Sequence, residues 1–177
     1  IIGLIFLGTI LCVFYPFFFT FSWNGFSIIG EDFLAGSSVI PWVVCGYILY
    51  GFFILQMPSL YLKNKQIWAP VFWGCGALIN ILCNLVLIPK IGFVGAGIST
   101  LIAYATMAVF LYYKNRAWLP INYNMRLIFI VILISLFFLS TTIIYKNFFV
   151  FLIGPAIYSL LIGRLLVFYK KTLLLQK

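Results

Sequence analysis

Six long apolar runs constrain this chain more than any other feature of its sequence. A helix of about 20 apolar residues, rising 1.5 Å per residue, crosses a hydrocarbon core roughly 30 Å thick. The runs do not alternate polar and apolar residues as barrel strands do, so helices are favoured. The sequence predicts an all-α fold, a polytopic transmembrane helix bundle forming a single domain over residues 1–177, with spans near 1–21, 38–57, 67–88, 93–113, 127–145 and 148–169.

The basic residues indicate how these helices are oriented. The chain holds 11 Lys and Arg against 2 Asp and Glu, which in a soluble protein would suggest nucleic acid. Because the basic residues lie between apolar runs, they indicate membrane topology instead, and the expected partner is the lipid bilayer, with no nucleic acid. If the N-terminus is cytoplasmic, only Lys90 and Lys146 lie outside, and the inner connections hold Lys63, Lys65, Lys114, Arg116, Arg126, Arg164, Lys170, Lys171 and Lys177. Both ends are therefore predicted to be cytoplasmic.

Residues for covalent chemistry are scarce. General acid/base catalysis recruits His, Asp or Glu, and the chain has no His and one acidic pair, Glu31-Asp32, so we do not expect an enzyme. The four cysteines lie inside apolar runs without close CxxC spacing, which favours buried free thiols over a metal or redox site, and no cofactor is expected. The first Met is Met57, so we expect an N-terminal part to precede Ile1.

Small and amide side chains recur along the third run at three- and four-residue spacing, which places them on one helix face. They are Gly76, Ala77, Asn80, Cys83 and Asn84. The favoured interpretation is a helix–helix seam in which small residues permit close approach and amides bond across it. The alternative is the polar wall of a transport cavity. The opposite face is predicted to meet lipid, with Leu78, Ile81, Leu82 and Leu85.

The fourth run begins at Gly92–Gly97, after Pro89, and carries a second small-residue stripe. That stripe is Gly95, Ser99, Ala103 and Thr106. Two stripes on consecutive helices joined by a five-residue turn predict that the helices pack tightly. A phosphate-binding loop is disfavoured, because the run lacks the Lys-Ser/Thr ending of a P-loop and a preceding strand.

Four further residues are candidates for a substrate path. Tyr47, Tyr104 and Tyr158 lie near the centres of the second, fourth and sixth runs, where a hydroxyl needs a partner or water. An interhelical hydrogen bond and a cavity lining both satisfy that need. Arg164 lies inside the last run, close enough to its cytoplasmic end to extend its charge to the interface, so it is either a functional cation or a snorkelling one.

Several motifs in order resemble one family of exporters. They are Tyr61-Leu-Lys-Asn-Lys, then Ala77-Leu-Ile-Asn-Ile with Asn84, then Leu87-Ile-Pro-Lys-Ile-Gly, then Gly95-Ala-Gly-Ile-Ser-Thr-Leu. The run from Tyr61 to Arg116 resembles the C-terminal half of polysaccharide-biosynthesis and O-antigen flippases of the multidrug/oligosaccharidyl-lipid/polysaccharide exporter superfamily. Gly97 and Ser99 stand where the family pattern has alanines. The resemblance covers residues 1–116, and the last two runs match by hydropathy alone.

The resemblance implies the second lobe of a two-lobed exporter. Such a protein moves a polyprenyl-pyrophosphate-linked oligosaccharide across the bacterial cytoplasmic membrane, and the expected partners are that lipid-linked oligosaccharide and a missing N-terminal lobe. The candidate path residues are Asn80, Asn84, Tyr47, Tyr104, Tyr158 and Arg164. Two alternatives stay open: a drug or small-molecule exporter of the same superfamily, expected to carry a carboxylate within the membrane, and a membrane repeat-unit polymerase or ligase, expected to carry a large external loop with Arg or His.

Overall fold

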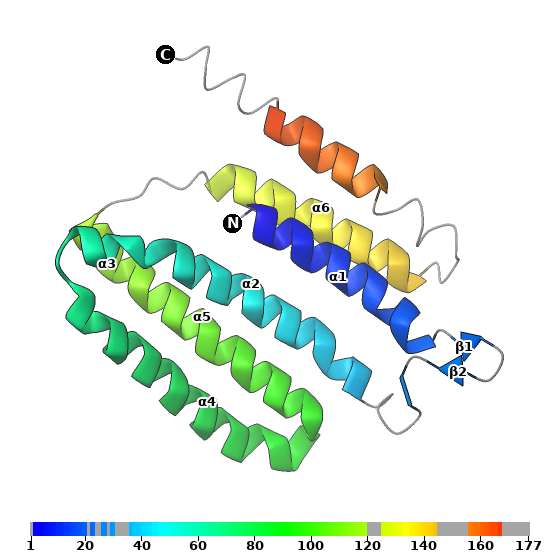
Figure 1. Cartoon of the computed structure of the whole chain (residues 1–177), viewed down its shortest axis with the longest axis horizontal. Helices are drawn as coiled ribbons and strands as arrows, with labels where there is room; N and C mark the ends of the chain where they lie inside the picture. The colour runs from blue at the N-terminus through cyan, green and yellow to red at the C-terminus, as the bar shows by residue number, and fades with distance from the viewer. Residues whose placement is uncertain are drawn as a thin grey trace. The chain divides into compact units, whose positions relative to one another are not determined.

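The computed structural model describes residues 2–20, 22–23, 26–27, 29–30, 36–119, 125–144 and 156–167 (Figure 1). This part of the chain is helical apart from one small antiparallel hairpin. In the hairpin β1 (Ser22–Trp23) pairs with β2 (Phe26–Ser27). The chain falls into two compact units, the first comprising Pro16–Tyr123 and the second Ile2–Tyr15 together with Asn124–Lys177.

The first unit contains the long helices of the described chain. Its elements are α2 (Ile40–Gln56), α3 (Pro58–Leu62), the 3-10 turn η2 (Gln66–Trp68), α4 (Ala69–Ile91) and α5 (Phe93–Trp118). Three helical stretches here are long and apolar enough to cross a membrane: Gly36–Leu62, Gln66–Ile91 and Phe93–Trp118. The prediction of a helical fold with membrane-spanning character is confirmed at that level.

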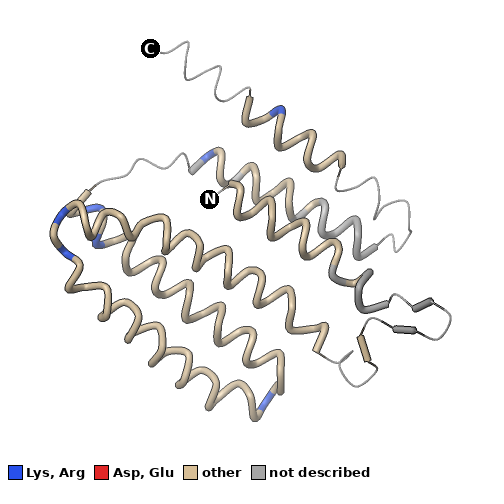
Figure 2. Tube along the Cα trace, viewed as in Figure 1, with Lys and Arg blue, Asp and Glu red and all other residues tan. Residues whose placement is uncertain are grey.

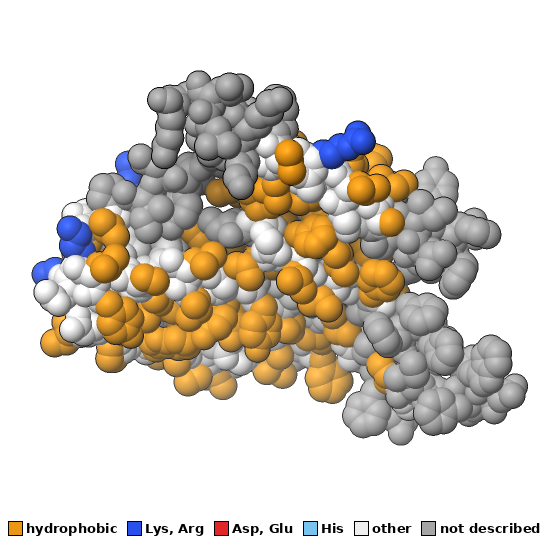
Figure 3. Space-filling model, turned by 45° about the horizontal axis from the view of Figure 1, so that its top comes forward, with side chains coloured by type: hydrophobic (Ala, Val, Ile, Leu, Met, Phe, Trp, Pro, Cys, Tyr) orange, Lys and Arg blue, Asp and Glu red, His pale blue; other side chains and the backbone are white. Residues whose placement is uncertain are grey.

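Helix α5 lies between α2 and α4 in this unit (Figure 1). It is the most buried of the three long helices, whereas α2 and α4 bury few of their residues. Figure 3 shows how widely hydrophobic side chains cover one face of the molecule. On α4 the exposed residues include the four predicted to meet lipid, Leu78, Ile81, Leu82 and Leu85. Exposed apolar flanks of this extent suit a lipid solvent rather than water.

The hydrophobic core of the first unit lies where α3 meets the other helices. Its buried residues are Phe53, Leu60, Phe72, Met107, Ala108 and Leu111. Rings add to it, since Phe72 meets Phe110 with centroids 5.1 Å apart and Phe53 meets Phe72 at 6.3 Å. Large side chains therefore fill this end of the unit, which we call the aromatic end.

The connection from α4 to α5 is a single residue, Gly92. The predicted five-residue turn was wrong, because α4 continues through Pro89 to Ile91 and α5 begins at Phe93. Gly92 adopts φ +59° and ψ −138°, a conformation open to glycine and costly for other residues. Its N–H donates to the Ile88 carbonyl at 2.8 Å, and its carbonyl accepts from the Gly95 N–H at 2.9 Å.

The Tyr61–Lys65 motif ends α3 with a complete Schellman arrangement. Asn64 has φ +53°, its N–H donates to the Tyr61 carbonyl, and the Lys65 N–H donates to the Leu60 carbonyl. Asparagine tolerates the left-handed conformation better than most residues, which explains its presence at this position.

Helix α5 extends further than predicted. Its last turns hold Lys114 and Arg116, which the predicted boundary placed in a connecting loop. A cation in the last turn interacts favourably with the negative end of the helix dipole.

The second unit is built from three shorter apolar helices in its described residues. They are the first part of α1 (Ile2–Thr20), α6 (Met125–Ile144) and a helix at Ala156–Val167. Buried apolar side chains come from each of them, among them Val13, Val131 and Ile162. The remainder of the predicted span 148–169 lies outside the described residues. A count of six spans therefore stays a prediction.

Candidate functional site

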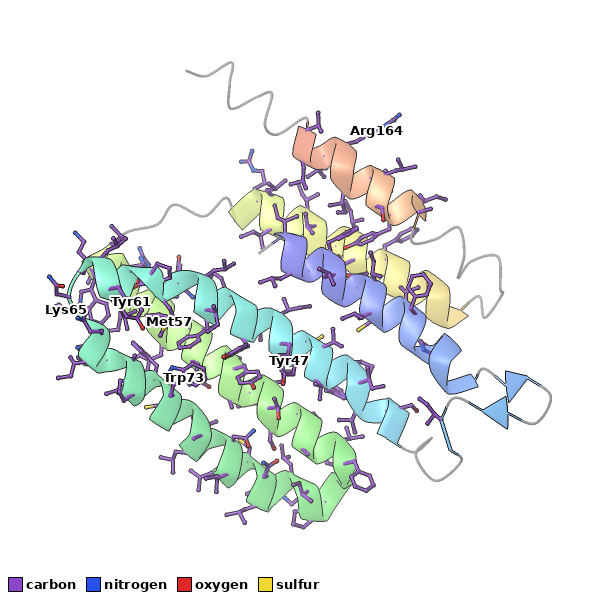
Figure 4. All side chains as sticks on the ribbon, in the orientation of Figure 1. Tyr47, Met57, Tyr61, Lys65, Trp73 and Arg164 are labelled. Carbon is purple, nitrogen blue, oxygen red and sulfur yellow. The ribbon has the colours of Figure 1, made fainter. Side chains whose placement is uncertain are left out.

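An aromatic cluster of Tyr47, Tyr50, Trp73 and Tyr104 lies on one side of the first unit. Ring centroids of Tyr50 and Tyr104 are 4.8 Å apart, and those of Tyr47 and Tyr104 are 5.7 Å apart. Tyr50 also meets Trp73 edge-on at 5.7 Å. Tyr47 is 56% exposed and Trp73 43% exposed, so the cluster opens onto the surface (Figure 4).

The local sequence explains how three helices meet in this cluster. Tyr47 and Tyr50 are three residues apart on α2 and share one helix face. Helices α2 and α5 pack against each other here, and a Cβ on Gly46 would make an ordinary contact with the Leu101 Cα at 3.4 Å. Tyr104 of α5 contacts both tyrosines of α2.

The cluster joins two of the predicted path residues, Tyr47 and Tyr104. Its three phenol groups can donate and accept hydrogen bonds, and its rings offer apolar faces. No carboxylate or imidazole belongs to it, so the arrangement can bind a ligand but supplies no ordinary acid–base pair. The sequence analysis missed two members, Tyr50 and Trp73. Tyr50 could have been found from its three-residue spacing to Tyr47 on the same helix. Trp73 lies on α4, and no sequence spacing relates it to the cluster.

A second polar feature, the amide chain, lies between α4 and α5. Asn84 Nδ2 donates to Asn80 Oδ1 at 2.9 Å, Asn80 Nδ2 approaches Thr100 Oγ1 at 3.4 Å, and Thr100 donates to the Ala96 carbonyl at 3.0 Å. Asn80 thus contacts the neighbouring helix α5, and Asn84 bonds Asn80 on its own helix. This geometry supports the seam interpretation more than the cavity wall.

One atom of the amide chain has no partner among the described residues. The side-chain carbonyl oxygen Asn84 Oδ1 is buried without a hydrogen bond. A buried acceptor left unpaired costs free energy, so Asn84 contributes less to the seam than Asn80.

The predicted packing residues lie at close helix contacts. A Cβ on Gly95 would lie 2.7 Å from the backbone C and O of Leu87 in α4, and one on Gly76 would lie 2.3 Å from Met107 Sδ in α5. Ser99 is fully buried and bonds the Gly95 carbonyl at 2.8 Å, and Ala103 is buried on the same helix. Thr106 lies on α5 and bonds its own helix at the Ile102 carbonyl.

Tyr158 lies in the second unit, fully inside its packing. Its hydroxyl is 2.7 Å from Ser135 Oγ and 3.3 Å from Thr9 Oγ1, and its ring stacks on Phe6 with centroids 5.4 Å apart. The sequence left two interpretations of Tyr158, an interhelical hydrogen bond and a cavity lining. These contacts agree with the interhelical hydrogen bond.

Arg164 is exposed on the helix at Ala156–Val167, and Figure 4 shows its side chain directed outward from that helix. It is six residues from Tyr158, whose side chain is buried, so the two occupy different helix faces. Arg164 therefore does not join the contacts that hold Tyr158.

A buried polar cluster that the sequence did not reveal joins α2, α3 and α5. We call Gln56, Ser59 and Asn115 the polar knot; all three are nearly or fully buried. Ser59 Oγ bonds Asn115 Oδ1 at 2.5 Å, and both Ser59 Oγ and Asn115 Nδ2 donate to the Gln56 carbonyl, at 2.6 Å and 3.3 Å.

The break between α2 and α3 explains the polar knot. The Leu60 N–H, which would reach the Gln56 carbonyl in a continuous helix, bonds Met57 instead, and Pro58 has no N–H to donate. Gln56 therefore has a carbonyl without a helical partner, and side chains from α3 and α5 satisfy it. Gln56 Nε2 in turn reaches the Ala108 carbonyl of α5 at 3.3 Å.

Metal-binding residues do not gather anywhere in the described part of the chain, where no three His, Cys, Asp or Glu side chains come together. The cysteines Cys12, Cys45, Cys75 and Cys83 form no disulfide with one another.

Comparison with protein-family models, with curated proteins and with solved structures finds no match to this chain.

Proposed function

We propose that this chain is the membrane-embedded lobe of an exporter that moves a polyprenyl-pyrophosphate-linked oligosaccharide across the bacterial cytoplasmic membrane. The observation that supports it most is the aromatic cluster halfway along α2 and α5. Its tyrosines hold hydroxyl groups on helices whose remaining flanks are apolar, and Tyr47 is more than half exposed. A hydroxyl at that depth needs a polar partner.

A sugar is a suitable partner for this surface. Binding sites for small polar molecules combine apolar walls with a few placed polar groups, and tyrosine supplies both in one side chain. The motifs between Tyr61 and Arg116 add the resemblance to lipid-linked oligosaccharide exporters. The scarcity of His, Asp and Glu supports translocation over covalent chemistry.

The topology completes the proposal. The excess of basic residues on alternate connections supports a topology with both ends of the segment on the cytoplasmic side of the inner membrane. Alternating access further requires a second lobe, because a cavity that opens to each side in turn needs two bodies that rock against each other.

The test compares three tyrosine variants of the full-length exporter in cells that depend on it. Tyr47→Ala should slow export of lipid-linked repeat units roughly three- to tenfold, since one aromatic contact contributes about 0.5–1.5 kcal/mol. Tyr47→Phe keeps the aromatic ring and removes the hydroxyl, so comparing it with Tyr47→Ala shows which of the two groups export requires. Tyr61→Ala is the matched control, because Tyr61 is 61% exposed but lies at the end of the helix.

The measurement is the distribution of undecaprenyl-linked repeat units between the two leaflets. Accumulation on the cytoplasmic leaflet in Tyr47→Ala, with thermal stability retained, is the expected result. If repeat units reach the outer leaflet normally but are not polymerised, the chain belongs with the enzymes. If only efflux of small molecules falls, it belongs with drug exporters.

A further inference from the structure

One end of the first unit gathers exposed cations beside exposed apolar side chains. Lys63, Lys65 and Arg116 are exposed at the turn between α3 and η2 and in the last turn of α5 (Figure 2). Lys114 adds a fourth cation, and Lys65 is labelled in Figure 4. Among the described residues of this unit, Lys90 in the last turn of α4 is the cation at the opposite end.

Three contacts hold these segments together. Lys114 Nζ lies 4.4 Å from the ring centroid of Trp68, a cation–π distance, and Trp68 meets Trp118 at 5.8 Å. The hydrogen bond from Ser59 to Asn115 joins α3 to the residue between Lys114 and Arg116. The cations of the two segments therefore form one surface.

The sequence supplies few anions to balance these cations. It has 11 Lys and Arg against 2 Asp and Glu, a formal net charge of +9. The part of the chain that the structure describes includes no Asp or Glu side chain.

The residues between the cations indicate which anion fits. Leu62, directly before Lys63, is 71% exposed, and Ile67, two residues after Lys65, is 79% exposed. Exposed leucine and isoleucine side chains beside the amines gain no favourable burial when a soluble phosphate binds. At a membrane surface the apolar side chains enter the acyl region, while the amines meet headgroup phosphates and the tryptophans lie at the interface.

We propose that Lys63, Lys65, Lys114 and Arg116 form a binding surface for anionic phospholipid headgroups of the surrounding bilayer. Lys114, held over Trp68, forms its inner wall, and the two lysines of the turn with Arg116 form its exposed rim. The proposal depends on α2, α4 and α5 lying in a membrane and is independent of transport, so it can fail while the exporter proposal holds.

The experiment measures lipid preference at each end of the unit by tryptophan fluorescence. The full chain is reconstituted in vesicles, and quenching by phosphatidylglycerol brominated near the headgroup is compared with quenching by the same brominated phosphatidylcholine. A W23F/W42F/W73F background keeps Trp68 and Trp118 as reporters beside the cations. A W23F/W68F/W73F/W118F background keeps Trp42, at the other end of α2, as the matched control.

Trp68 and Trp118 should show a preference for phosphatidylglycerol of at least about fivefold, the factor expected for one cation near an anionic surface. Trp42 should show little preference. K63Q/K65Q/K114Q/R116Q should abolish the preference at Trp68 and Trp118, whereas K63R/K65R/K114R/R116K should retain it, which separates charge from misfolding.

Equal quenching by the two lipids at Trp68 and Trp118 would overturn the proposal, as would a preference that survives K63Q/K65Q/K114Q/R116Q. In the last part of the experiment, the quenching measurement is repeated after millimolar inorganic pyrophosphate is added. If it abolishes the preference in the parent protein at constant ionic strength, the surface binds free phosphate groups rather than bilayer lipid, and the proposal is wrong.

Discussion

The two ends of the first unit pack by opposite means. At the aromatic end, Phe53, Phe72 and Phe110 fill the space between helices. The polar knot joins α2, α3 and α5 at the same end. At the other end, which we call the glycine end, side chains are absent where Gly95 meets Leu87 and where Gly97 meets Val39 and Trp42. One end gains stability from buried volume, and the other from close backbone approach.

This difference determines how each end should respond to substitution. A side chain in contact with another side chain can shift, whereas a Cβ directed at backbone atoms cannot be accommodated without moving a helix. The following three predictions test that distinction, and thermal unfolding of the purified chain in detergent is their common measurement.

The largest effect is expected for Gly95→Ala. Its Cβ would lie 2.7 Å from the Leu87 backbone, so α4 and α5 must separate, at a cost of about 1–3 kcal/mol or more. Gly76→Ala should cost less, although its Cβ would lie 2.3 Å from Met107 Sδ, because the methionine side chain is flexible.

Gly74→Ala is the matched control for both glycine variants. It lies in the same helix as Gly76, a Cβ there meets nothing within 4 Å, and alanine favours the helix by up to about 1 kcal/mol. If Gly95→Ala and Gly74→Ala unfold at the same temperature, α4 and α5 do not pack closely at Gly95 and the prediction is wrong.

A smaller effect is expected at the polar knot. Asn115→Leu removes the bond to Ser59 and one donor to the Gln56 carbonyl, which should cost about 1–3 kcal/mol because the partners stay buried. Gln56→Leu should cost less, because Gln56 Oε1 is already buried without a partner among the described residues.

A double-mutant cycle isolates the central bond of the knot. Ser59→Ala and Asn115→Ala should be coupled by about 0.5 kcal/mol or more, since the two side chains bond directly. Strictly additive costs would show that the bond contributes nothing to stability.

The smallest effect is expected along the amide chain. Asn80→Leu should lower the stability by about 0.6–2 kcal/mol, the range for hydrogen bonds between membrane helices. Asn84→Leu should cost less, because it removes one bond and also the unpaired Oδ1. The reverse order would place Asn84, rather than Asn80, at the main contact with α5.

The sequence predicted helices well where apolar residues run without interruption. The spans predicted at 38–57, 67–88 and 93–113 correspond to α2, α4 and α5, with ends displaced by a few residues. The span predicted at 67–88 ends before Pro89, whereas α4 continues through this proline to Ile91 although proline has no N–H to donate.

Contacts between distant residues could not be predicted in the same way. Tyr158 meets Thr9, which is 149 residues away, and Gln56 reaches Ala108, which is 52 residues away. Helical periodicity assigns a residue to a face but not to the helix opposite it. Gln56 also lies at the end of an apolar run, where a polar residue ordinarily indicates the membrane interface rather than a buried bond.

The single-residue link at Gly92 has a consequence for how this protein enters the membrane. One residue between the helices keeps the C-terminal end of α4 beside the N-terminal end of α5. Where both helices span the bilayer they form a hairpin with Lys90 next to its tip, so the Lys90 charge must cross the hydrocarbon when the hairpin inserts.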